Sequence, residues 1–101
     1  MAPMSLEELT DRIRKQMSEG TGLDATVKFA FGDDGVIFVD GVSSPNRVSN
    51  EDSEAQCTLL ISLDDFTKLV AGELDAAAAL VEGRIRIEGD LGVAMKLAQA
   101  M

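Results

Sequence analysis

Two apolar runs joined by a turn constrain the fold of this chain more than any other feature. Val27, Phe29 and Phe31 recur at every second position, which is the period of a β-strand with one buried face. Residues 32–35 read Gly-Asp-Asp-Gly, and an Asp-Gly pair between apolar strands is a strong hairpin signal. The run 36–39 then returns with apolar residues on both faces, so the sequence predicts a β-hairpin inside a sheet.

Helical signals stand on both sides of this hairpin. Ser5 and Glu8 form a capping box, and apolar residues follow it at helical spacing up to Gly20. Ser62 and Asp75 are the predicted N-caps of two later helices. The apolar stripe of the first helix consists of Leu6, Leu9, Ile13 and Met17.

The remaining segments complete the predicted order of elements. Residues 43–53 are polar and indicate a loop with at most a short edge strand near Arg47, and alternation resumes at 55–61 and 84–88. A last helix from residue 90 is apolar around most of its circumference, so we expect it to be buried. Residues 1–101 are predicted to form one α+β domain, with helices on one face of a mostly antiparallel sheet.

The charge excludes several classes of partner. The chain has 9 basic and 18 acidic residues and a net charge of −9, which argues against nucleic acid and against strong binding to anionic membranes. Between Gly32 and Asp65 the acids greatly outnumber the single base, Arg47. This surplus is explained by turns and helix starts, or it forms a patch for a basic partner or a divalent ion.

The composition also indicates the compartment. The single cysteine, the lack of an apolar run of about 20 residues and the lack of a secretory signal at the start predict a soluble, cytoplasmic domain.

No constellation of catalytic residues is visible. The chain has no histidine, and Cys57 falls on the inward face of a predicted strand, where a packed thiol is expected. Asp33, Asp34 and Asp40 do not have the spacing of a calcium loop. We therefore expect no enzyme activity, no cofactor and no metal.

The predicted interior combines a bulky sheet with small helices. The facing helices carry Ala76–Ala79 in one case and Gly92, Ala94, Ala98 and Ala100 in the other. Small side chains either let the backbones approach closely, which gives an ordinary tight core, or leave a gap. The sequence keeps both alternatives open.

Several segments of the chain resemble the sterol carrier protein type 2 family. The resemblance lies in residues 24–41 (Asp-Ala-Thr-Val-Lys-Phe-Ala-Phe-Gly-Asp-Asp-Gly-Val-Ile-Phe-Val-Asp-Gly), 55–66, 72–75 and 83–97. The last of these blocks is the most specific, because a strand, a Gly-Asp turn and Ala-Met-Lys-Leu follow one another. The resemblance implies a five-stranded, mostly antiparallel sheet with helices on one face, enclosing an apolar tunnel for sterols, fatty acids, acyl-CoA or similar lipids.

The resemblance also implies which residues would line the tunnel. These are Phe29, Phe31, Ile37, Val39, Leu59, Ile61, Phe66, Leu69, Val70, Ile85, Ile87, Val93, Met95, Leu97, Ala98 and Met101. The expected partner is a small apolar ligand, with at most transient membrane contact and a monomeric or weakly dimeric state. The alternative is an accessory or oligomerisation domain with the same fold and a filled core.

Overall fold

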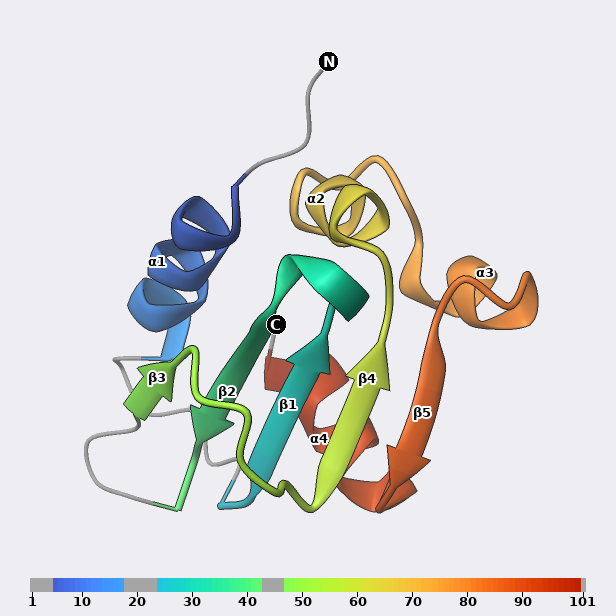
Figure 1. The fold of residues 1–101 in the computed structure, drawn as a ribbon. Coiled ribbons are helices and arrows are strands. Elements are labelled where there is room, and N and C mark those ends of the chain that lie inside the picture. Colours follow the sequence, from blue (N-terminus) through green and yellow to red (C-terminus); the bar gives the residue numbers. More distant parts are fainter. Residues whose placement is uncertain (1–4, 18–23, 43–46, 101) are drawn as a thin grey trace.

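The two apolar runs around residues 27–31 and 36–39 form neighbouring strands of a sheet (Figure 1). A computed structural model describes residues 5–17, 24–42 and 47–100. The described elements are, in order, α1 (Leu6–Met17), β1 (Thr26–Ala30), a 3₁₀ turn (Gly32–Asp34), β2 (Val36–Asp40), β3 (Arg47–Ser49), β4 (Cys57–Leu60), α2 (Leu63–Val70), α3 (Ala76–Val81), β5 (Arg86–Gly89) and α4 (Leu91–Ala100). The predicted α+β class and order are confirmed. The stop signal expected at Gly20 lies outside the described residues.

The five strands form one mixed sheet in the order β3-β2-β1-β4-β5. Three of the four pairings are antiparallel, and only β1 and β4 run parallel. The prediction of a mostly antiparallel sheet is therefore confirmed. The central position of β1 places Phe29 opposite Ile37 on one side and Leu59 on the other.

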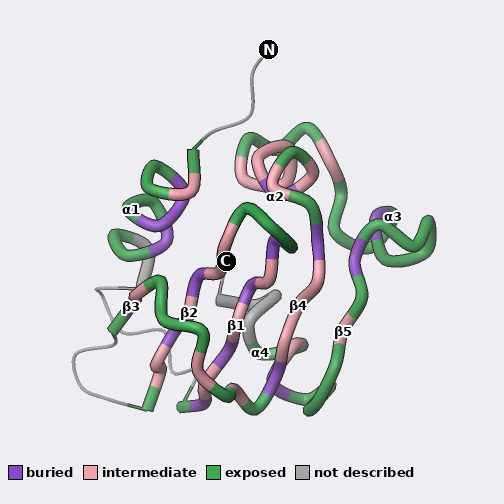
Figure 2. Tube along the Cα trace, in the orientation of Figure 1, coloured by how far each residue is buried: buried purple, intermediate pink, exposed green. Residues whose placement is uncertain are grey.

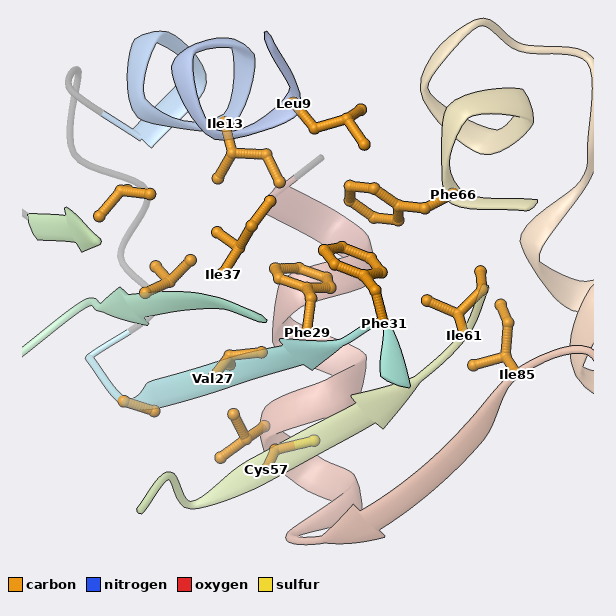
Figure 3. Close-up of a cluster of buried hydrophobic side chains, with 14 of the residues drawn as sticks. Leu9, Ile13, Val27, Phe29, Phe31, Ile37, Cys57, Ile61, Phe66 and Ile85 are labelled. Carbon is orange, nitrogen blue, oxygen red and sulfur yellow. The ribbon is translucent and has the colours of Figure 1, made fainter. Parts of the chain in front are cut away.

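All four helices lie on the same face of this sheet. The buried positions of β1 and β2 alternate with half-buried ones (Figure 2), and the side chains of Phe29, Phe31 and Ile37 lie on the side of the sheet that faces α1 and α2 (Figure 3). Helix α1 packs on β2 and β3, while α4 packs on β1, β4 and β5. The segment before β4 crosses the other face, where Lys28 Nζ lies 2.7 Å from Asp52 Oδ1.

The hairpin between β1 and β2 is confirmed, but its turn is longer than two residues. Gly32–Asp34 form a 3₁₀ turn, closed by the N–H of Phe31 donating to the carbonyl of Gly35 at 2.9 Å. Gly32 and Gly35 both have positive φ, at 61° and 110°, which glycine adopts without strain. Phe31 stays buried under this turn and contacts the ring of Phe66.

The three predicted helix caps are present. The N–H of Glu8 donates to Ser5 Oγ at 3.1 Å, and Ser5 Oγ donates back to Glu8 Oε1 at 3.2 Å. Ser62 Oγ accepts from the N–H of Asp65 at 3.0 Å, and Asp75 Oδ2 accepts from the N–H of Ala78 at 3.2 Å. These bonds fix where α1, α2 and α3 begin.

The apolar helix α4 packs on the sheet as expected, but it is buried along one side only. Val93 packs into the core, but the side chains of Leu91 and Met95 are 62% and 67% exposed. The reason is geometric, because a helix lying on one face of a sheet buries only the stripe that faces it.

Replacing the cap of α2 tests how strongly it holds the helix. Ser62→Ala removes the acceptor for the N–H of Asp65, and we expect a loss of about 1 kcal/mol in the free energy of unfolding. The Ser62→Asp variant keeps an acceptor and should stay within about 0.5 kcal/mol of the wild type. Urea denaturation of the three proteins measures both differences. Equal destabilisation of the two variants would show that the hydrogen bond does not matter.

Candidate functional site

A large cavity lies between the sheet and the helices of the described part of the chain. Its volume is about 640 Å³ and it is open to solvent. The lining residues come from β1, β4, α2, the connection to α3, the start of α3, the residue before β5, and α4. They are Phe29, Leu59, Ile61, Phe66, Leu69, Val70, Gly72, Glu73, Leu74, Asp75, Ala76, Ile85 and Ala94.

The inner wall follows from two periodicities. Phe29 and Leu59 are register partners in the parallel pair β1–β4, so they point to the same face of the sheet. On α2, Phe66, Leu69 and Val70 stand at positions i, i+3 and i+4, and a helix places these on one side. The Phe66 and Phe29 rings are 5.0 Å apart and tilted by 44°, which fixes α2 against the sheet (Figure 3).

The exposed lining residues Gly72, Glu73, Asp75 and Ala76 lie in the connection between α2 and α3 and at the start of α3, and we call this side of the cavity its mouth. The N–H of Gly72 donates to the carbonyl of Leu69 at 3.1 Å, and the N–H of Glu73 donates to that of Lys68 at 2.8 Å. Together with the positive φ of Gly72, 78°, these bonds form a Schellman motif that satisfies the last carbonyls of α2. Asp75 then caps α3. The backbone of the mouth is therefore held by its own hydrogen bonds.

The charged groups at the mouth are both acidic. Glu73 and Asp75 line the cavity and are exposed, and no basic residue is among the described lining residues. The bases nearest in sequence pair with other acids. Lys68 Nζ lies 3.5 Å from Asp64, and the Arg84 guanidinium lies 3.5 Å from Asp65 and from Glu82. The cavity thus combines an apolar interior with a negatively charged entrance.

Seven of the residues predicted to line an apolar tunnel border this cavity. They are Phe29, Leu59, Ile61, Phe66, Leu69, Val70 and Ile85. Phe31, Ile37, Val39 and Val93 are buried in the surrounding core, and Ile87 is half-buried beside it. The side chains of Leu97, Ala98 and Met101 lie outside the described part.

Met95 does not lie where it was predicted to lie. It was expected to close the tunnel, but its side chain is directed away from the core and 67% exposed. Its neighbour Ala94 lines the cavity in its place. One residue along a helix corresponds to a turn of about 100°, so the apolar run alone did not show which side of α4 faces inward.

The sequence reasoning missed the whole mouth. Residues 72–75 were assigned to the end of one helix and the start of the next, and their role depends on how α2 and α3 are placed in space. The sequence did carry a signal for Ala76 and Ala94, because the small residues of these two helices left open either a tight core or a gap. Both residues border the cavity, which corresponds to the second alternative.

Comparisons with known proteins agree with this fold. The model of the SCP-2 sterol transfer family matches residues 5–101. Human sterol carrier protein 2 is 38% identical over 48 residues, which are 48% of this chain and 9% of the human protein. The chain thus spans less than a tenth of the length of this relative.

Two solved structures show the same fold. The apo form of sterol carrier protein 2 from Yarrowia lipolytica has a TM-score of 0.69 and 22% identity, over 89% of this chain and 84% of that one. The palmitated SCP2L2 of Aedes aegypti, a solution structure, has a TM-score of 0.65 and 22% identity, over 95% and 93% of the two chains.

The described residues include one thiol, that of Cys57. They hold no group of three or more metal-ligating side chains, and no described helix is long and apolar enough to cross a membrane. Cys57 is fully buried on the helix-covered face of β4. Burial raises the pKa of its thiol, and the nearby negative charge of Asp90 raises it further. The thiol therefore stays protonated at neutral pH.

The reactivity of Cys57 tests this placement. A thiol is nucleophilic only as the thiolate, so a raised pKa and a lack of access both slow alkylation. We expect iodoacetamide at pH 8 to modify native protein about 100-fold or more slowly than urea-unfolded protein. Mass spectrometry of timed samples measures the two rates. Fast modification of the native protein would contradict a structural role for this cysteine.

Proposed function

The chain belongs to the SCP-2 sterol transfer family, and we propose that it binds one apolar lipid molecule in the cavity between its sheet and helices, without chemical change. The family supports lipid binding and transfer in general. The observation that carries the proposal for this chain is the cavity, whose interior is built from aromatic and aliphatic side chains of β1, β4 and α2.

The size of the cavity suits a lipid. Pockets for small ligands usually measure about 300–1,000 Å³, and 640 Å³ falls in the middle of this range. Each methylene removed from water contributes about 0.8 kcal/mol, so about 12 of them contribute on the order of 10 kcal/mol. The lost translational freedom and the ordering of the chain remove several kcal/mol. We expect affinities in the micromolar range.

The acidic mouth is expected to give charged and uncharged lipids different affinities for the cavity. Sterols, fatty acids and acyl-CoA are all proposed ligands of such a cavity, and palmitate in the Aedes aegypti structure supports a single acyl chain. A fatty acid with its carboxylate at the mouth would meet Glu73 and Asp75. Like charges about 4 Å apart repel by about 1 kcal/mol in water and more near a protein surface. We therefore propose that uncharged lipids, such as sterols and long-chain alcohols, bind better than anions.

Loading and release are proposed to be passive. The ligand would pass through the open mouth beside residues 72–76 during transient contact with a membrane or micelle. Neither step needs a protein side chain to gain or lose a proton.

An accessory or oligomerisation domain without a ligand is the second candidate. The favouring observation is that the matched segment of the human relative is 9% of its length, so this fold occurs inside longer proteins. The open cavity supports the carrier over a filled core. Native mass spectrometry of freshly purified protein separates the two, because a carrier is expected to retain a co-purified lipid.

A tryptophan at the mouth should block binding. Ala76 lines the cavity, while its neighbour Ala77 is exposed and does not line it. We expect Ala76→Trp to raise the Kd of a fluorescent sterol about tenfold or more, since the ring fills the entrance, a change of about 1.4 kcal/mol.

The Ala77→Trp variant is the matched control for this blocking experiment. It adds the same ring to the same exposed helix and should leave the Kd unchanged. Circular dichroism checks that both variants fold. If the two variants bind the sterol equally well, the lipid does not enter beside α3.

The charge at the mouth can be tested separately from the cavity. Glu73→Lys replaces repulsion with attraction for an anionic headgroup, so it should lower the Kd of palmitate severalfold and leave that of hexadecanol unchanged. Glu51→Lys makes the same charge change at an exposed position that does not line the cavity. If both variants change palmitate binding by the same factor, net charge and not the mouth is responsible.

A further inference from the structure

The outer edge of β5 is a sheet edge without a partner strand among the described residues. β5 is the last strand of the sheet and is hydrogen-bonded on one side to β4. No described strand covers its other side (Figure 1). Exposed edges offer unpaired backbone groups to other chains, and proteins usually protect them.

The opposite edge of the sheet is protected. β3 is only three residues long, and the Arg14 side chain from α1 donates to the carbonyl of Val48 at 3.1 Å. Helix α1 also packs on β3. The two edges of the sheet therefore differ, since one carries a side-chain block and the other does not.

The ladder between β4 and β5 shows which backbone groups face outward. The N–H of Asp90 donates to the carbonyl of Gln56 at 2.8 Å, so these residues form a hydrogen-bonded pair. Hydrogen-bonded and non-hydrogen-bonded pairs alternate in antiparallel ladders. Arg86 and Glu88 consequently direct their backbone groups to β4, and Ile87 directs its N–H and C=O to the open edge.

We propose that β5 pairs with β5 of a second copy of this chain, antiparallel and with the two-fold axis at Ile87. The outward groups of the two Ile87 residues then exchange two hydrogen bonds, and the two sheets become one continuous sheet. A two-fold interface brings the same patch together from both copies, so the patch must complement itself.

The charge pattern of the strand meets this requirement. With the axis at Ile87, Arg86 lies opposite Glu88 of the second copy, and Glu88 lies opposite Arg86. Neither side chain has an ion pair with another described residue, and both are exposed. They form a non-hydrogen-bonded pair, in which the Cα atoms are only about 4.5 Å apart and the side chains close.

Arg84 and Asp90 lie just beyond the two ends of β5 and also carry opposite charges. The proposed register brings the end of the strand with Arg84 next to the end with Asp90 of the second copy. Both already have partners within the chain, Asp65 for Arg84 and the N–H of Gly92 for Asp90. Arg84 and Asp90 add attraction between the two copies, but the pairing of Arg86 with Glu88 determines the register.

Exposed apolar residues stand beside the same edge. Val81 at the end of α3 is 87% exposed, and Leu91 and Met95 at the start of α4 are also exposed. Helix α3 lies beside the start of β5, and α4 begins at its end (Figures 1 and 2). Dimer formation would bury apolar surface that an isolated chain leaves in water.

The test is a charge-swap cycle read by sedimentation velocity over micromolar to millimolar protein at low salt. The wild type should show a concentration-dependent dimer. R86E places two acids opposite each other and E88R places two bases opposite each other, so each should raise the dimer Kd about tenfold or more. The double variant R86E/E88R recreates the complementary pairs and should return to the wild-type Kd.

Two controls separate the edge from net charge. R12E and E7R make the same charge changes on exposed positions of α1, away from β5, and should leave the dimer Kd within about twofold. Amide exchange supplies an independent readout, because the N–H of Ile87 should become protected only as the protein concentration rises. A wild type that stays monomeric throughout the range, or a double variant no better than the singles, would overturn the proposal.

Discussion

The contact of one phenylalanine ring with two others determines where space remains in this molecule. Phe66 on α2 lies 5.0 Å from Phe29 and 5.3 Å from Phe31, measured between ring centroids. These bulky rings hold α2 above the sheet, while Ala76 and Ala94 stand at the border of the space. Three large side chains at one end and small ones at the other cannot close the layer evenly. The cavity is a consequence of this difference in size.

Much of the fold follows from local sequence signals. Some features depend only on short segments and not on their surroundings. They include the period of two around Phe29, the caps at Ser62 and Asp75, and the edge strand near Arg47. The class, the order of elements and most of the inner wall of the candidate site were therefore predictable. The connection at residues 32–35 was predictable as well, and its two glycines both take positive φ.

The parts that were not predictable depend on distant contacts. Whether Met95 or Ala94 faces inward is decided by how α4 lies on β1, β4 and β5. The mouth is decided by where α2 ends and α3 begins relative to the sheet, and Glu73 has no sequence signature that would mark it as a lining residue. Periodicity shows that a helix has an apolar side, but the orientation of that side comes from tertiary packing.

The parallel pairing of β1 with β4 has a kinetic consequence. Phe29 and Leu59 are neighbours in the sheet although thirty residues separate them, and the intervening chain must first turn through β2 and β3. The loss of chain entropy precedes the gain from such a long-range contact, which slows the assembly of non-local sheets. The wall of the cavity is thus expected to be among the last regions to become ordered as the chain folds. Until these strands pair, an incompletely folded molecule has no cavity that could bind an apolar ligand.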